Sequence, residues 1–192
     1  MRKILLAPCV MILTFAAFAN AARADDDAGS HLPLPRFAAL RSAEVNMRTG
    51  PGTRYPIEWV YTRRGLPVEV IAEYDVWRRV RDSEGAEGWI NRIELTGKRA
   101  AIVTGDAPTA PPPAPGTADS NANATTPASA PPTKDLHDDA DDSSAVVAHV
   151  QAGAIGDLIS CAPVWCKLKF GDVKGYMRKS DLWGAYPDEK FD

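Results

Sequence analysis

Residues 46–56 read Asn-Met-Arg-Thr-Gly-Pro-Gly-Thr-Arg-Tyr-Pro, and this stretch decides the fold. Its centre, Gly50-Pro51-Gly52, is a strong turn signal, because glycine tolerates unusual backbone angles and proline fixes its own φ. Further turn signals follow at 65–67, 74–75 and 83–85. Between them lie short runs rich in β-branched and aromatic residues, at 68–70, 77–81 and 88–90. This spacing predicts an all-β barrel or sandwich, with a 3₁₀ turn at 91–95 before a final strand.

The same pattern occurs a second time in the chain. Gly65 and Gly153 lie 88 residues apart, and so do Trp77 and Trp165. After one deletion, at an offset of 87, Gly88-Trp89-Ile90 matches Gly175-Tyr176-Met177, and Leu95 matches Leu182. This agreement predicts a duplicated unit.

The 46–56 stretch resembles the opening motif of the bacterial SH3-like (SH3b) domains. The resemblance continues through Gly65, 68–70, Trp77, Val80 and 88–90, and covers roughly residues 37–103. In the second block Leu136-His137 stands where Met47-Arg48 stands, but acidic residues and serines replace the Gly-Pro-Gly turn. The resemblance implies five-stranded, partly open SH3-like barrels at 36–103 and, in degenerate form, at 134–186, followed by a tail at 187–192. It also implies a binding module of exported cell-envelope proteins.

Composition predicts how these blocks are connected. Residues 104–133 contain 8 Pro, 8 Ala and 6 Thr, with no Val, Ile, Leu, Met or aromatic residue. Such a segment cannot bury enough apolar surface to offset its ordering entropy, so it is predicted to be a disordered linker. Two Pro-x-x-Pro patterns, at 108/111 and 112/115, leave open a polyproline ligand for the barrels, although a plain tether is favoured. A shorter disordered lead is expected at 25–35.

Residues 1–24 are expected to be a secretory signal peptide. Arg2 and Lys3 precede an apolar run, and small-x-small cleavage sites end at Ala21 and Ala24. The run of about 15 residues is shorter than the ~20 that span a bilayer, so a cleaved signal is favoured over an anchor. The sequence therefore predicts export to the periplasm or cell envelope, without stable membrane insertion after signal removal. Export and a formal net charge of −3 also argue against a nucleic-acid partner.

Aromatic and basic side chains near the turns of the first barrel are the candidate ligand-binding residues. Aromatic walls with arginines beside them could hold a peptide and clamp its carboxylates. The alternative is that the tryptophans cap a small core and the arginines are solvated. The candidates are Arg48, Arg54, Tyr55, Tyr61, Trp77 and Trp89.

Cys161 and Cys166 enclose a four-residue turn, and a structural disulfide is preferred over a free pair or a redox site. No metal or cofactor is expected, because zinc would need two more ligands from only His31, His137 and His149.

Two barrels and a linker leave no room for a catalytic domain of about 100 residues, so no enzyme activity is expected. The predicted function is a non-catalytic binding module of the cell envelope that docks peptidoglycan stem peptides or an envelope protein. The alternative is a structural or assembly scaffold whose SH3-like barrels mediate protein–protein contacts. The sequence leaves the oligomeric state open.

Overall fold

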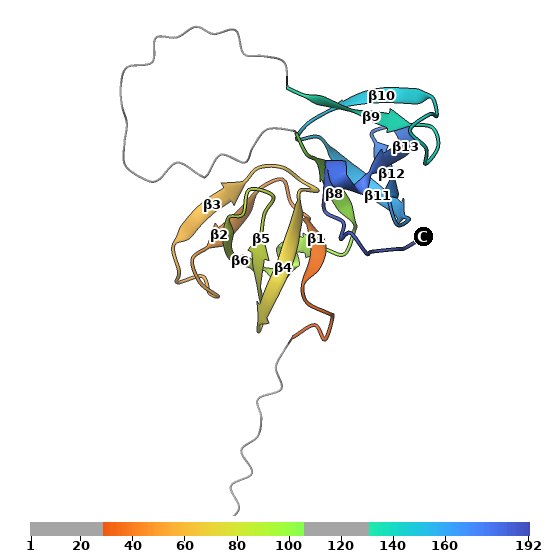
Figure 1. Ribbon diagram of the computed structural model, residues 1–192. Helices are drawn as coiled ribbons and strands as arrows, with labels where there is room; N and C mark the ends of the chain where they lie inside the picture. The colour runs from red at the N-terminus through yellow and green to blue at the C-terminus, as the bar shows by residue number, and fades with distance from the viewer. Residues whose placement is uncertain (1–28, 106–130) are drawn as a thin grey trace, which may run out of the picture.

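The computed structural model describes residues 29–105 and 131–192 (Figure 1). The predicted signal peptide, most of the predicted lead and residues 106–130 of the predicted linker lie outside the described residues. The described chain is all-β, with fourteen strands in two seven-stranded sheets and two 3₁₀ turns. The predicted fold class, a pair of SH3-like barrels, is confirmed.

The first barrel is one antiparallel sheet that curves round on itself, and most of its neighbouring strands are connected as hairpins. Alternate residues of its strands point inward, and the buried ones include Met47, Val68, Val70, Val80 and Ile90. The 3₁₀ turn predicted before the last strand is confirmed by η1 (Arg92–Glu94). The sheet order is β3-β2-β6-β5-β4-β1-β7. Its strands are β1 (Arg36–Leu40), β2 (Val45–Arg48), β3 (Ile57–Tyr61), β4 (Pro67–Tyr74), β5 (Trp77–Arg81), β6 (Glu87–Asn91) and β7 (Leu95–Thr96).

The second barrel repeats this arrangement strand for strand, which confirms the predicted duplication. Its order, β10-β9-β13-β12-β11-β8-β14, is that of the first barrel with each number raised by seven. The register also agrees, because Arg48 pairs with Trp89 and His137 pairs with Tyr176. The strands are β8 (Ala100–Val103), β9 (Thr133–His137), β10 (Val146–Gln151), β11 (Ile155–Cys161), β12 (Trp165–Phe170), β13 (Val173–Arg178) and β14 (Leu182–Trp183), with η2 (Lys179–Asp181) before the last.

Each barrel has seven short strands where the resemblance implied five. In both barrels the segment before the long central strand forms a hairpin of its own, β2–β3 in the first and β9–β10 in the second.

Glycines at equivalent positions let these hairpins cross the sheet closely. A Cβ added at Gly88 would lie 2.5 Å from Met47 Cγ, and one at Gly175 would lie 2.6 Å from the carbonyl oxygen of His137.

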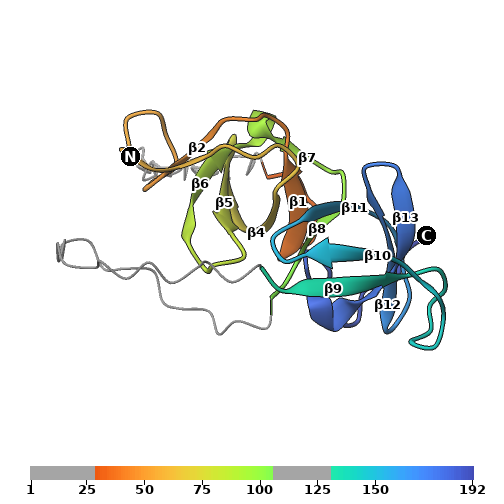
Figure 2. The same ribbon diagram turned by 90° about the horizontal axis from the view of Figure 1, so that it is seen from above.

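The position of β8 corrects the predicted limits of the two barrels. Residues 100–103 were expected in the first barrel, but β8 pairs with β11 and β14 of the second. Figure 2 labels β8 beside β11 of the second barrel. The second barrel therefore begins before the Pro-rich segment, which is an insertion between its first two strands. In the first barrel the equivalent connection is only residues 41–44. The four apolar residues of β8 would suit either sheet, and only the strand pairing assigns them.

The two barrels pack directly against each other. The connection between β7 and β8 is only residues 97–99. The Phe37 ring meets the ring of Trp183 edge-on at 5.0 Å and that of Tyr186 at 4.7 Å. The Tyr186 hydroxyl donates to Glu69 Oε1 at 2.9 Å, and Arg99 Nη2 donates to the Gly184 carbonyl at 2.8 Å. Side chains from both repeats therefore form one polar and aromatic interface.

Cys161 and Cys166 face each other across the β11–β12 hairpin, with Cα atoms 4.1 Å apart, and form the predicted disulfide. The Cys161 backbone also holds the C-terminal tail, because its N–H donates to the Phe191 carbonyl at 2.8 Å and its carbonyl accepts from Phe191 N at 3.1 Å. Within the described ranges, no helix has the length and apolar character needed to cross a membrane.

Candidate functional site

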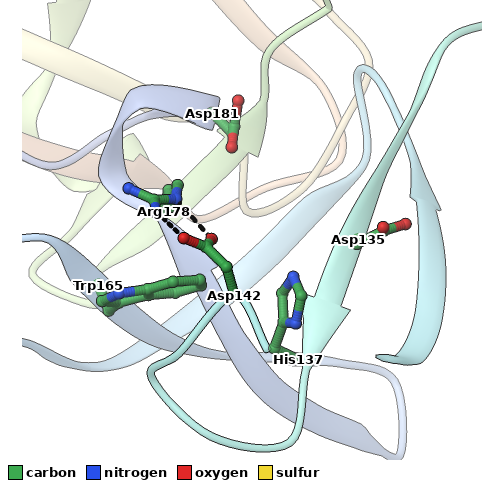
Figure 3. Close-up of a pocket in the computed structure, with 6 residues that line it drawn as sticks. All are labelled: Asp135, His137, Asp142, Trp165, Arg178 and Asp181. Atoms are coloured by element: carbon green, nitrogen blue, oxygen red, sulfur yellow. Dashed lines mark hydrogen bonds and ion pairs between the residues drawn. The ribbon is translucent and has the colours of Figure 1, made fainter. Parts of the chain in front are cut away.

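A hollow of about 200 Å³ opens on the second barrel, between the β9–β10 loop, the start of β12 and the turn η2 (Figure 3). Each of these elements supplies at least one polar or aromatic side chain to it. The lining residues are Asp135, His137, Asp142, Trp165, Arg178 and Asp181. Because they come from positions up to 46 residues apart, the hollow exists only in the folded barrel.

Trp165 provides the aromatic wall of the hollow. The His137 ring meets it edge-on, with centroids 5.5 Å apart. The Arg178 guanidinium carbon lies 5.0 Å from the indole centroid, a cation–π distance. The indole is thereby fixed between an imidazole and a cation, and the small part of it that remains exposed lines the hollow.

Each carboxylate of the hollow has a basic neighbour. Arg178 binds Asp142 with both ends of its guanidinium, and the Nε to Oδ1 distance is 2.8 Å. The Arg178 hydrogen bond lowers the pKa of the Asp142 carboxyl, which therefore stays ionised. Asp181 Oδ1 lies 3.1 Å from Lys134 Nζ, and Asp135 Oδ1 lies 2.7 Å from His149 Nδ1.

The Asp142–Arg178 pair sits where water reaches it, and that makes it exchangeable. The side chains of Asp142 and Arg178 are 60% and 42% exposed. Exposed pairs contribute only about 0–1 kcal/mol each, so a ligand's own ammonium or carboxylate can replace one partner at low cost. The hollow thus suits a small ligand group that carries charges beside an apolar surface.

The β9–β10 loop that carries Asp142 is held by its own hydrogen bonds. His137 Nδ1 lies 3.3 Å from the Ser144 carbonyl oxygen. Asp141 Oδ1 accepts from the Ser143 N–H at 2.7 Å and from its hydroxyl at 2.8 Å, and these bonds lower the pKa of Asp141. The loop geometry therefore positions Asp142 before any ligand arrives.

Four of the six predicted binding residues gather at the equivalent place in the first barrel. Arg48, at the position of His137, donates from Nη1 to the carbonyl oxygens of Tyr55 (2.8 Å) and Thr53 (3.2 Å) and so folds the 49–56 loop back. The Arg54 guanidinium lies 5.1 Å from the Tyr55 ring centroid. Trp89 is half-buried on β6, opposite Arg48.

The other two predicted residues, Tyr61 and Trp77, are buried. Tyr61 lies in the first core, and its hydroxyl donates to Asp82 Oδ2 at 2.9 Å. Burial and the Asp82 carboxylate raise the pKa of Tyr61. Trp77 begins β5 and is 9% exposed, as is its counterpart Trp165. These side chains support the barrel, and Trp165 shows that a residue at this position can still line a hollow.

The sequence prediction missed the hollow itself and two exposed aromatic residues, Trp59 and Tyr74. Trp165 was already aligned with Trp77 in the repeat, which was a usable signal. The Asp142–Arg178 pair joins a loop to a strand end 36 residues later, and nothing in the sequence marks that pairing. Trp59 is 57% exposed on β3, although its strand reads as an ordinary apolar run. Among the described residues, no group of three or more His, Cys, Asp or Glu side chains is placed to hold a metal ion.

Proteins similar to this chain include two solved structures and one protein family. The chain is similar to the solved structure of NlpC1 from Trichomonas vaginalis, with 10% identity, 81% of this chain and 48% of that chain covered, and a TM-score of 0.31. It is similar to NlpC2 from the same organism, with 9% identity, 78% and 48% covered, and a TM-score of 0.31. The chain thus spans about half the length of these proteins, and no curated protein matches it. The bacterial SH3 domain family matches residues 41–97 and 131–184, more than half of the chain, so this protein belongs to the bacterial SH3 domain family.

Proposed function

We propose that this protein is a non-catalytic binding module of the cell envelope that docks peptidoglycan stem peptides. The observation that carries the proposal is the hollow of the second barrel, where the Trp165 indole lies beside the Asp142–Arg178 pair. Stem peptides carry carboxylates and amines close to short aliphatic side chains. Arg178 would take a ligand carboxylate, Asp142 would take an ammonium group, and Trp165 would cover the aliphatic part.

The first barrel would offer a second, more basic docking face. Trp89 and Tyr55 would form its wall, and Arg54 would position an anionic group because its side chain is exposed. Arg48 already donates two hydrogen bonds to the loop, so its main contribution would be to hold Tyr55 in place. The Cys161–Cys166 disulfide supports an exported location, since disulfides persist in oxidising compartments.

Co-sedimentation with purified sacculi tests this proposal. The mature chain should leave the supernatant together with the sacculi, and added salt should weaken binding because charge pairs contribute. Arg178→Gln should reduce the bound fraction several-fold, and so should Trp89→Ala, with near-UV circular dichroism showing that both variants are folded. Val173→Ala, at an exposed position of β13 outside the hollow, serves as the control. Failure to co-sediment at any salt concentration would overturn the proposal.

One observation favours a second candidate function, an assembly scaffold that contacts protein partners. Ile57, Trp59 and Val60 are all exposed on the terminal strand β3, at 47%, 57% and 41%. Large apolar side chains grouped on a sheet edge are typical of protein-binding surfaces. Loss of sacculus binding combined with retention of a protein complex would favour this function.

A further inference from the structure

A second hollow, of about 280 Å³, lies where the two barrels meet. The first barrel contributes β3, the connection after it and the β5–β6 turn, and the second contributes β8 and the β10–β11 turn. Arg63 spans the junction, because its Nη2 donates to the Gly153 carbonyl oxygen at 2.8 Å. The hollow is thus a product of the packing between repeats and differs from the hollow beside Trp165.

One side of this hollow is an open sheet edge. β3 is the terminal strand of the first sheet and pairs only with β2 among the described strands. Alternate N–H and C=O groups of a terminal strand point outward, where another extended chain can pair with them. Of the usual protections of such edges, β3 has one charged residue, Glu58, at a register shift between β2 and β3, but it contains no lysine and no proline.

The floor and rim of the hollow carry an excess of carboxylates. Asp82 and Glu84 line it from the β5–β6 turn. Burial raises the pKa of Tyr61, and the charges of Asp82, Glu84 and Glu58 of β3 raise it further. Asp82 is satisfied by neutral donors, namely Tyr61 Oη and the backbone N–H groups of Glu84 and Ala86. Among the described residues that line the hollow, Arg63 is the one basic side chain, and its Nη2 donates to the Gly153 carbonyl oxygen.

We propose that this junction hollow docks an extended peptide strand carrying a lysine or arginine side chain. The strand would pair with the outer edge of β3, and its basic side chain would enter the hollow. There the cation would face the exposed Trp59 indole and the carboxylates of Asp82 and Glu84. A volume slightly below the ~300 Å³ of small-ligand pockets suits one long side chain with its backbone.

The proposed site belongs to the first barrel and its junction alone. By register, the residue of the second barrel equivalent to Trp59 is Ala148, because Trp59 pairs with Met47 and Ala148 with Leu136. The second barrel therefore serves as a comparison within the same chain, because it has alanine where the first barrel has tryptophan. The site is also independent of stem-peptide docking, since no residue lines both hollows.

Nuclear magnetic resonance of the full ¹⁵N-labelled chain tests the proposal. The probe is the blocked peptide acetyl-Thr-Val-Lys-Val-Thr-amide, and the matched probe has Glu in place of Lys. The Lys peptide should shift the Trp59 indole N–H signal saturably, with the signal assigned by its loss in Trp59→Phe. The Glu peptide should bind at least about tenfold more weakly, because it meets like charge.

Three variants complete the design. Trp59→Ala should weaken binding of the Lys peptide about tenfold or more, because the bound peptide would bury this aromatic side chain. Glu84→Gln should weaken it about two- to fivefold, as for one exposed charge pair. Tyr74→Ala removes an equally exposed aromatic residue, 61% accessible, outside the hollow, and should leave binding unchanged.

Several outcomes would overturn the proposal. Equal binding of the two peptides would remove the charge argument, and equal loss in Tyr74→Ala would remove the location. Shifts confined to the Trp165 indole would assign the peptide to the other hollow. A Trp59 shift that grows with protein concentration alone, together with a dimeric mass, would show that the edge of β3 pairs with a second copy of the chain.

Discussion

The carboxylate of Glu73 anchors the described start of the chain to the first barrel, and changing it should alter how stability depends on pH. Its side chain is only 7% exposed and accepts from Ser30 N at 2.5 Å, from Ser30 Oγ at 2.6 Å and from Arg36 Nη2 at 2.5 Å. Arg78 Nε lies 3.1 Å from the same carboxylate, and the Arg78 side chain is 3% exposed. Glu73 therefore balances two guanidinium groups, one of them buried.

The magnitude follows from the pKa of Glu73. Burial alone would raise this pKa, but the hydrogen bonds from Ser30 and Arg36 outweigh burial and lower it from 4.5 to about 2. At 1.36 kcal/mol per pH unit, the ionised carboxylate stabilises the fold by up to about 3 kcal/mol, with water screening at the rim reducing that value. Because the folded pKa is lowered, this stability is fully present above pH 4.5 and is lost as the pH falls towards 2.

Urea unfolding of the wild type and of Glu73→Gln, followed by tryptophan fluorescence from pH 7 to pH 2, measures this contribution. Glu73→Gln should be destabilised at pH 7, and the difference between the two proteins should shrink below pH 4.5. All other titrating carboxylates are common to both proteins and cancel in that difference. A difference that stays constant from pH 5 to pH 2 would refute the assignment of the lowered pKa to Glu73.

Two further predictions concern the second barrel. Replacing Cys161 and Cys166 with Ser should lower the free energy of unfolding by about 2 kcal/mol, the loop-closure entropy of a six-residue ring. The urea midpoint with and without reductant checks this, and a wild-type mass that gains no two daltons on reduction would contradict the disulfide. A fragment spanning 104–192 lacks β8 and should show no cooperative thermal unfolding, whereas 98–192 retains all seven strands and should unfold more cooperatively. Equal melting behaviour of the two fragments would contradict the assignment of β8.

The regular strands could be predicted from local sequence, and the long-range pairings could not. β5 has the bounds that its alternating residues predicted, and η1 lies where a single turn was expected. β8 was misassigned because four consecutive apolar residues show no periodicity that selects one sheet over the other. Tyr61 is buried in the first core, and its hydroxyl donates to Asp82, 21 residues away, a contact that no local pattern reveals.

The candidate sites illustrate the same limit. Aromatic residues near turns were recognisable from the sequence, and four of the six predicted residues lie together in the first barrel. The hollow beside Trp165 needs an acidic loop to fold back onto Arg178, and the junction hollow needs two repeats to pack. Both are properties of the assembled chain, so a residue-by-residue comparison of the repeats cannot supply them.

The placement of the Pro-rich insertion has a consequence for how the molecule responds to proteolysis. The Pro132 carbonyl accepts from Ala152 N at 2.8 Å, and the Val103 carbonyl accepts from Gly153 N at 2.8 Å, so both ends of the insertion are fixed to neighbouring residues of one turn. A protease that cuts inside the insertion would therefore nick the protein without releasing either barrel. The two fragments would stay associated through β8 and separate only on denaturation.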